Sequence, residues 1–341
     1  MDGPHALTAP YAGGMDDWQP DLLGPPFEQL TLPLGTDDQG PIVATLVRSI
    51  PRRTLRRLPL AGVDVLSVHG WSDYFFQPQA AQFFTARGAR FHALDLRKYG
   101  RSLRPGQTPG DIGRLDDYDA DIEAALQAMG QGQDAATSRR LVLLGHSTGG
   151  LVLSLWAARH PGRAAALVLN SPWLELQLGA IGRGAVAPLV NARARIDPRG
   201  LNPVVDFGFY TRAQHEVGAL PVAGYREDWR PARGFRVHAG WLAAILDGHR
   251  RVRAGLGLEC PVLVLLSARS TPPLTWSEQM TRTDSVLVVD DIAKAATRLG
   301  RLVTIARIDG AIHDVFLSAV APRADAYAAL SRWLVSELHD R

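Results

Sequence analysis

The segment Gly145-His146-Ser147-Thr148-Gly149 has the composition and spacing of a nucleophilic serine motif, G-x-S-x-G. It stands between an apolar run that ends at Leu144 and a segment with helical periodicity. A serine at the crest of a tight strand-to-helix turn is exposed, because only glycine fits close to the strained backbone on either side. In that setting the N–H of Thr148 would point at a forming oxyanion. We therefore predict that Ser147 is a nucleophile and not part of a plain glycine-rich turn.

A serine hydroxyl is a weak nucleophile at neutral pH unless a histidine takes its proton and a carboxylate orients that histidine. His313 is the candidate base, because it lies in a loop directly after the last predicted strand and before the closing helix. The other histidines come too early in the chain or lack a strand end beneath them. His146 belongs to the turn itself and is expected to point away from the reaction.

The carboxylate is harder to assign from the sequence. Its expected place is directly after the apolar run that ends at Leu266, but residues 267–270 read Ser-Ala-Arg-Ser and contain no acid. Asp284 is the preferred candidate, because one helix and one strand fit between it and His313 and the order Ser, acid, His is kept. Two carboxylates that resemble a helix cap and two beside the histidine remain as alternatives, namely Asp290, Asp291, Asp309 and Asp314.

A second N–H donor is expected in the loop after an earlier strand. The apolar run Val63–Val68 is followed by a His-Gly pair and then Trp71, at the start of a loop that precedes a helix. Trp71 is the predicted backbone donor of this loop. Together with the N–H of Thr148 it would form an oxyanion hole, in which each donor contributes about 10² to 10³ in rate.

Short apolar runs alternate with segments of helical periodicity along most of the chain. Buried strands that alternate with amphipathic helices form parallel units with right-handed crossovers, so the predicted fold class is α/β, doubly wound. The predicted strands are residues 63–68, 90–94, 141–144, 165–169, 261–266 and 302–306, preceded by a hairpin of residues 27–34 and 42–47. The predicted helices are residues 78–87, 118–129, 148–160, 290–299 and 323–338.

The alternation stops between residues 171 and 257, which are rich in Arg, Gly, Pro and Trp and contain no convincing buried strand. Insertions between parallel strands tend to lie over the carboxyl ends of the sheet, where open α/β folds bind ligands. We predict that residues 171–257 form an inserted cap. Residues 21–170 and 258–341 would then be the two parts of the core, and residues 1–20 a loose leader.

Composition excludes several classes of protein. The chain has 341 residues, a formal net charge of +3 and one cysteine, Cys260, so it lacks both a nucleic-acid-sized positive field and a disulfide framework. Glycines and polar residues interrupt the uncharged stretch Leu141–Ala158, which argues against a membrane span. No metal-binding, dinucleotide or phosphate-loop motif occurs in the sequence, so we predict no metal and no cofactor. A single cysteine is compatible with the cytoplasm, which is the predicted location.

Taken together, His69-Gly70-Trp71, the serine motif, Asp284-Ser285-Val286-Leu287 and His313 resemble the α/β-hydrolase superfamily. Within it the chain is most similar to the monoacylglycerol lipase, lysophospholipase and serine aminopeptidase-like branch, from about Phe27 to the end. The resemblance implies a mostly parallel, eight-stranded sheet with a mainly helical cap. It also implies a catalytic triad of Ser147, His313 and Asp284, with the N–H groups of Trp71 and Thr148 as the oxyanion hole. Residues 267–283 look inserted before the acid.

The leading hypothesis is a serine hydrolase that cleaves small-molecule carboxylic esters through an acyl-enzyme. A second hypothesis is an amide or peptide hydrolase of the aminopeptidase type, in which Glu216, Glu227 or Asp228 holds the substrate amine. A third is a non-hydrolytic, biosynthetic homologue, supported by the missing carboxylate after Leu266. Neither the natural substrate nor the oligomeric state follows from the sequence.

Overall fold

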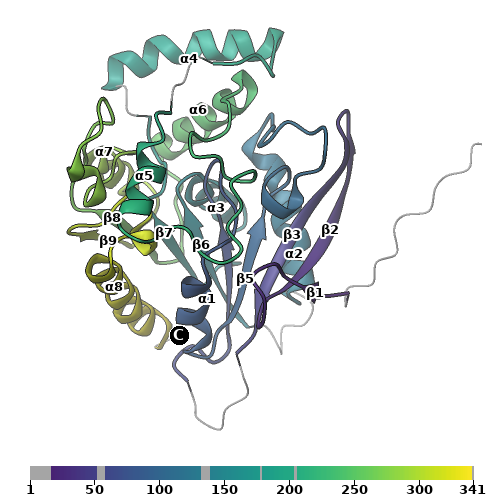
Figure 1. Ribbon diagram of the computed structural model, residues 1–341, viewed down its shortest axis with the longest axis vertical. Helices are drawn as coiled ribbons and strands as arrows, with labels where there is room; N and C mark the ends of the chain where they lie inside the picture. Colours follow the sequence, from purple (N-terminus) through teal and green to yellow (C-terminus); the bar gives the residue numbers. More distant parts are fainter. Residues whose placement is uncertain (1–16, 52–57, 132–138, 177–178, 203–205, 340–341) are drawn as a thin grey trace, which may run out of the picture.

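The computed structural model describes residues 17–51, 58–131, 139–176, 179–202 and 206–339. These residues form a sheet of nine strands in the order β1-β2-β3-β5-β4-β6-β7-β8-β9 (Figure 1). The pairs from β1 to β5 along this order are antiparallel, and all others are parallel. The strands are β1 Gln19–Pro20, β2 Glu28–Asp37, β3 Gly40–Ser49, β4 Val63–Val68, β5 Arg90–Asp95, β6 Arg140–His146, β7 Ala166–Asn170, β8 Val262–Ser267 and β9 Val303–Ile308.

Helices cover both faces of this sheet, as a doubly wound fold requires. Helices α1 and α8 share one apolar core with the sheet through residues such as Phe84 and Leu330. Helices α2, α3 and α7 share the other core, with Leu126, Leu151 and Ile292. The helices are α1 Pro78–Thr85, α2 Asp119–Ala128, α3 Thr148–Arg159, α4 Gly179–Ile196, α5 Phe209–Glu216, α6 Ala239–Ala254, α7 Val289–Ala296 and α8 Val320–His339.

The central strands β4, β6, β7 and β8 are buried almost throughout their length. A parallel strand with helices on both faces must present apolar residues on both sides, which explains why these strands are continuous apolar runs in the sequence. The predicted α/β fold is confirmed. So is the antiparallel hairpin at its start, in which β2 pairs with β3.

The predicted count of eight strands was one too low. The additional strand is β1, in which Gln19 and Pro20 pair with Gln29 and Glu28 of β2. A two-residue edge strand has no apolar periodicity and leaves no signal in the sequence. These residues fall in the predicted leader 1–20, of which only residues 17–20 are described, and this described part is ordered against the sheet and not loose.

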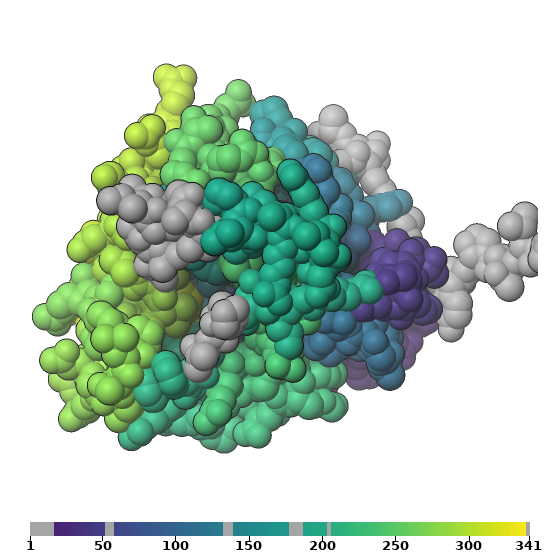
Figure 2. All heavy atoms as spheres, turned by 90° about the horizontal axis from the view of Figure 1, so that it is seen from above, coloured from purple at the N-terminus to yellow at the C-terminus, as the bar shows by residue number. Residues whose placement is uncertain are grey.

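The chain between β7 and β8, residues 171–261, is here named the β7–β8 segment. It contains α4, α5 and α6, and no strand of the sheet lies among its described residues. In Figure 1, α4 and α6 lie beyond one end of the strands. Figure 2 looks onto the face over which the β7–β8 segment spreads. Its helical content agrees with the predicted insertion, whereas the role of residues 171–257 as a cap stays a prediction.

No helix in the described residues combines the length and apolar character needed to cross a membrane.

Candidate active site

Ser147 occupies the turn between β6 and α3. Its φ of 50° and ψ of −117° lie in a strained region that non-glycine residues rarely adopt. The turn is so tight that a Cβ at position 145 would lie 2.6 Å from Gly150 Cα, and one at position 149 would lie 2.3 Å from His69 O. Both glycines of the motif are therefore required by close backbone packing. This is the strained strand-to-helix turn that the motif predicts.

The carboxyl end of β7 holds the turn in place. Asn170 O accepts hydrogen bonds from Ser147 N at 3.0 Å and lies 3.1 Å from His146 Nδ1. Ser147 O in turn accepts hydrogen bonds from Gly150 N and Trp173 N, each at 3.0 Å. The strained conformation is thus held by backbone contacts on both sides of the serine.

His313 and Asp284 form a buried pair. His313 Nδ1 lies 2.9 Å from Asp284 Oδ2, and the two side chains are 1% and 0% exposed. The other ring nitrogen, Nε2, is buried and has no hydrogen-bond partner among the described residues. The imidazole ring lies 5.0 Å from that of His146, the residue before Ser147. The structure gives no hydrogen bond between Ser147 and His313, and such contacts are often formed only with substrate bound.

The insertion before Asp284 does not displace this residue from the sheet. Residues 271–283 leave the end of β8 and return to it, where Asp284 pairs with Ser270 in a parallel bridge. Asp284 N donates to Arg269 O and Asp284 O accepts from Thr271 N, both at 2.9 Å. The chain therefore brings this carboxylate back to the edge where an acid is expected after β8, although none stands at residues 267–270.

The alternative carboxylates have other partners. Asp290 pairs with Arg307 and Asp309 with Arg269, and both carboxylates are about four-fifths exposed. Asp291 lies in the first turn of α7. Asp314 is buried, but its carboxylate binds a different set of groups. It accepts hydrogen bonds from Gln77 Nε2 at 2.7 Å, Asn170 Nδ2 at 2.6 Å and Phe316 N at 2.9 Å.

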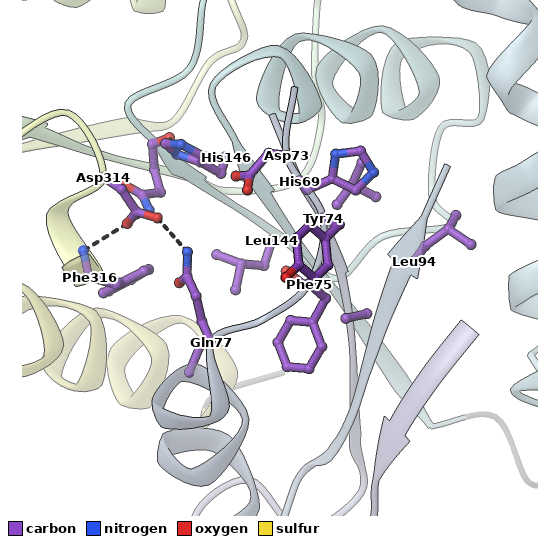
Figure 3. Close-up of a pocket in the computed structure, with 15 residues that line it drawn as sticks. His69, Asp73, Tyr74, Phe75, Gln77, Leu94, Leu144, His146, Asp314 and Phe316 are labelled. Atoms are coloured by element: carbon purple, nitrogen blue, oxygen red, sulfur yellow. Dashed lines mark hydrogen bonds between the residues drawn. The ribbon is translucent and has the colours of Figure 1, made fainter. Parts of the chain in front are cut away.

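Asp314, His146 and Gln77 line a small cavity of about 40 Å³, together with Asp73 and Asn170 (Figure 3). Burial opposes the ionisation of Asp314, but the neighbouring His146, Asn170 and Gln77 outweigh it and lower the pKa of this carboxyl. Burial also lowers the pKa of His146. Sequence reasoning passed over Asn170, which binds both the serine turn and the histidine loop. Its place at the carboxyl end of a predicted strand was the available signal.

The loop after β4 lies against the serine turn. A Cβ at Gly70 would lie 3.1 Å from Ser147 Cβ, so the main chain of this loop approaches the serine closely. Among the described residues, neither the N–H of Trp71 nor that of Thr148 has a hydrogen-bond partner. Thr148 opens α3, and the first N–H groups of a helix favour negative charge. Two unpaired donors thus flank the serine turn.

Comparison with known proteins gives a consistent result. The family model described as serine aminopeptidase, S33, matches residues 63–317. A monoacylglycerol lipase of Mycolicibacterium smegmatis is 31% identical over 136 residues, which are 40% of this chain and 44% of that relative. The matched part thus spans less than half the length of this relative.

Two solved structures have the same fold. A soluble variant of monoglyceride lipase from Saccharomyces cerevisiae superimposes with a TM-score of 0.60 at 13% identity and covers 96% of this chain and 100% of its own. The monoacylglycerol lipase of Paleococcus ferrophilus gives a TM-score of 0.56 at 19% identity, with 86% and 99% coverage. The resemblance inferred from the motifs is confirmed, because the family model spans most of the chain. The chain belongs to the serine aminopeptidase S33 family and has the α/β-hydrolase fold.

Proposed function

We propose that the protein is a serine hydrolase that cleaves small-molecule carboxylic esters. Ser147 Oγ attacks the ester carbonyl carbon while His313 Nε2 takes the hydroxyl proton. The bond to the alkoxy oxygen then breaks, and His313 returns the proton to the departing alcohol. Water attacks the acyl-enzyme in the same way, which releases the acid and restores the serine. Asp284 holds the imidazole in the required tautomer and stabilises its cationic form.

The negative charge that develops on the carbonyl oxygen needs donors that are already in place. In this proposal the N–H groups of Trp71 and Thr148 supply them. Because both are unpaired in the described residues, neither has to break an existing hydrogen bond when the oxyanion forms. Pre-oriented donors of this kind contribute about 10² to 10³ in rate each.

The observation that carries the proposal is the buried His313–Asp284 pair. One ring nitrogen lies 2.9 Å from the carboxylate, and the other has no partner among the described residues. Together with the strained Ser147 and the membership of a hydrolase family, this pair supports acyl transfer.

Ester cleavage is preferred over amide cleavage because the carboxylates predicted to hold a substrate amine are on the surface. Glu216 pairs with Arg212 and Asp228 with Arg226, so that the negative charge of each is already compensated. Glu227 is also exposed. An amine site built from these groups would have to replace two existing ion pairs.

The hypothesis of a non-hydrolytic homologue loses its supporting observation. It rested on the missing carboxylate after Leu266, and Asp284 returns to this edge of the sheet and contacts His313.

We also propose that residues 171–257 form a cap over the site. The cytoplasmic location inferred from the cysteine content stays a prediction.

Replacing Ser147 by Ala tests the proposal directly. The variant should fold like the wild type and lose at least about 10³-fold in the kcat for short p-nitrophenyl esters, because the nucleophile is gone. A fluorophosphonate probe should label the wild type at Ser147 and leave S147A unlabelled. Unchanged turnover in S147A, or labelling of wild type at another serine, would remove the proposed nucleophile. Thermal unfolding of both proteins serves as the control for folding.

A further inference from the structure

The loop of residues 69–77, here named the oxyanion loop, has a strained point directly after the proposed donor. Ser72 follows Trp71 and has a φ of 52°, in the left-handed region where L side chains are disfavoured. Such a conformation persists only when its surroundings determine it. The contacts that hold this loop therefore decide where the N–H of Trp71 points.

Three successive side chains of the oxyanion loop bind the β7–β8 segment. Ser72 Oγ accepts a hydrogen bond from Phe235 N at 3.0 Å. Asp73 Oδ1 accepts one from Arg230 Nε at 3.0 Å. The Tyr74 hydroxyl accepts from Arg226 N at 2.6 Å and lies 3.2 Å from Gly224 O. The strained part of the loop is thus held mainly by residues far along the chain.

Arg230 is the charged centre of this contact. Its side chain and that of Asp73 are 7% and 8% exposed. Its guanidinium also donates to Gln214 Oε1 through Nη2 at 2.8 Å and reaches the Tyr225 hydroxyl at 3.4 Å. A planar guanidinium can hold these groups at once in fixed directions, which a lysine ammonium cannot do.

The same network reaches the proposed base. Gln214 belongs to α5, and the ring of Tyr210 in this helix lies edge-on to His313 at 5.3 Å. The Tyr210 hydroxyl accepts a hydrogen bond from Asp314 N at 3.2 Å. Figure 3 shows Asp73 on the same side of the cavity as His146, whose ring contacts His313. Arg230 therefore connects the oxyanion loop with the helix that packs on the proposed base.

We propose that Arg230 is a positioning residue, which holds the oxyanion loop through Asp73 and keeps it in register with His313 through α5. This inference rests on the proposed function. Arg230 does not touch the reacting atoms in this scheme. Its effect comes through the placement of the Trp71 N–H, so it acts on the transition state more than on the binding of substrate.

Arg230→Met tests this role, with Arg230→Lys as the conservative variant. In R230M, kcat for p-nitrophenyl esters should fall by about 10-fold to 100-fold, because a displaced donor loses most of its contribution, while KM changes by less than about threefold. A trifluoromethyl ketone, which forms a tetrahedral adduct, should lose affinity by the same factor as kcat. R230K should be intermediate, because it keeps the charge but not the planar geometry.

The matched control is Arg90→Met. Arg90 is the first residue of β5 and pairs with buried Asp64 near the start of β4. Ser147 follows the carboxyl end of β6, so the two positions lie at opposite ends of the parallel strands. R90M also removes an arginine that pairs with a buried carboxylate, although Arg90 is partly exposed and Asp64 keeps Arg139 as a partner. R90M should lower the melting temperature with kcat unchanged. Hydrogen–deuterium exchange supplies a readout independent of activity. Exchange of residues 69–77 should become faster in R230M and remain unchanged in R90M.

The outcomes separate this inference from the proposed function. If R230M and R230K lower only the melting temperature, and kcat and the exchange of residues 69–77 match the wild type, Arg230 is a structural residue and the inference is wrong. If R230M does not fold, R230K decides between the same two results. A wild type that neither hydrolyses esters nor binds the ketone overturns the proposed function. Faster exchange in R230M would then still support the link between Arg230 and the loop.

Discussion

Asp284 uses its two carboxylate oxygens for different purposes. Oδ1 accepts hydrogen bonds from Val286 N at 2.7 Å and Leu287 N at 2.8 Å, whereas Oδ2 faces His313. Backbone donors on one oxygen prevent the carboxylate from rotating, so the other oxygen keeps a fixed direction toward the imidazole. A local turn of the chain thus prepares the group that orients the proposed base.

Asp284→Asn should lower kcat for ester hydrolysis by about 10³-fold to 10⁴-fold, because an amide in this position favours the wrong histidine tautomer. KM should change little. The matched controls are D290N and D309N, which alter exposed carboxylates engaged in surface ion pairs. Steady-state kinetics of the three variants gives the answer. A loss in D290N or D309N as large as in D284N would mean that the acid has been assigned to the wrong residue.

At the scale of elements, the site depends on the close approach of α3 to β4. Gly149 lies in the first turn of α3, and the carbonyl groups of Val68 and His69 lie where its Cβ would be, at 2.5 and 2.3 Å. The oxyanion loop starts at this same end of β4. The packing of one helix against one strand therefore sets the distance between the two proposed N–H donors.

Gly149→Ala should destabilise the protein by about 1 to 3 kcal/mol, because the methyl group forces α3 and β4 apart. It should also reduce kcat, since the separation displaces the N–H of Trp71 relative to Ser147. Gly113→Ala is the control, as a Cβ at this exposed position meets no atom within 4 Å. Urea unfolding and ester kinetics measure the two effects. Equal stability and activity of G149A and G113A would contradict this account of the turn.

At the scale of the whole molecule, a buried histidine in the sheet makes stability depend on pH. His92 lies in β5 and is 3% exposed. Burial lowers its pKa from 6.5 to about 4, an effect that Arg90 increases and Asp64 opposes. The unfolded chain therefore binds a proton in a pH range in which the folded protein does not. Stability from this group is present above pH 6.5 and decreases as the pH falls toward 4.

Replacing His92 by Gln should remove up to about 3 kcal/mol of this pH-dependent loss between pH 6.5 and 4. The free energy of unfolding should thus fall more steeply for the wild type than for H92Q between pH 7 and pH 4. The exposed His215→Gln variant should follow the wild-type profile. Urea unfolding across this pH range is the measurement. Parallel profiles of wild type and H92Q would show that His92 does not cause the dependence.

Much of the fold was predictable because it depends on short-range patterns. The central parallel strands are buried on both faces and are therefore apolar runs. The bounds of all the parallel strands differ from the predicted ones, such as residues 63–68 and 302–306, by no more than two residues at either end. The turn at Ser147 was equally visible as a short motif. Gly145 is required by its contact with Gly150 within the turn, whereas Gly149 is required by Val68 and His69, which lie far away in the sequence. The edge strand β1 was missed because two residues cannot show a period.

The sequence by itself thus determined the alternation of strands and helices, the serine turn and the order of the candidate residues. Three contacts were decided only by the tertiary structure. They are the bridge between Asp284 and Ser270 across the insertion, the hydrogen bond from Asn170 to Asp314 and the ion pair between Arg230 and Asp73. Backbone conformation and hydrophobic periodicity are properties of neighbouring residues, so they can be read locally. Contacts between residues far apart in the chain depend on how the packed layers exclude water and pair buried polar groups, and no local pattern encodes them.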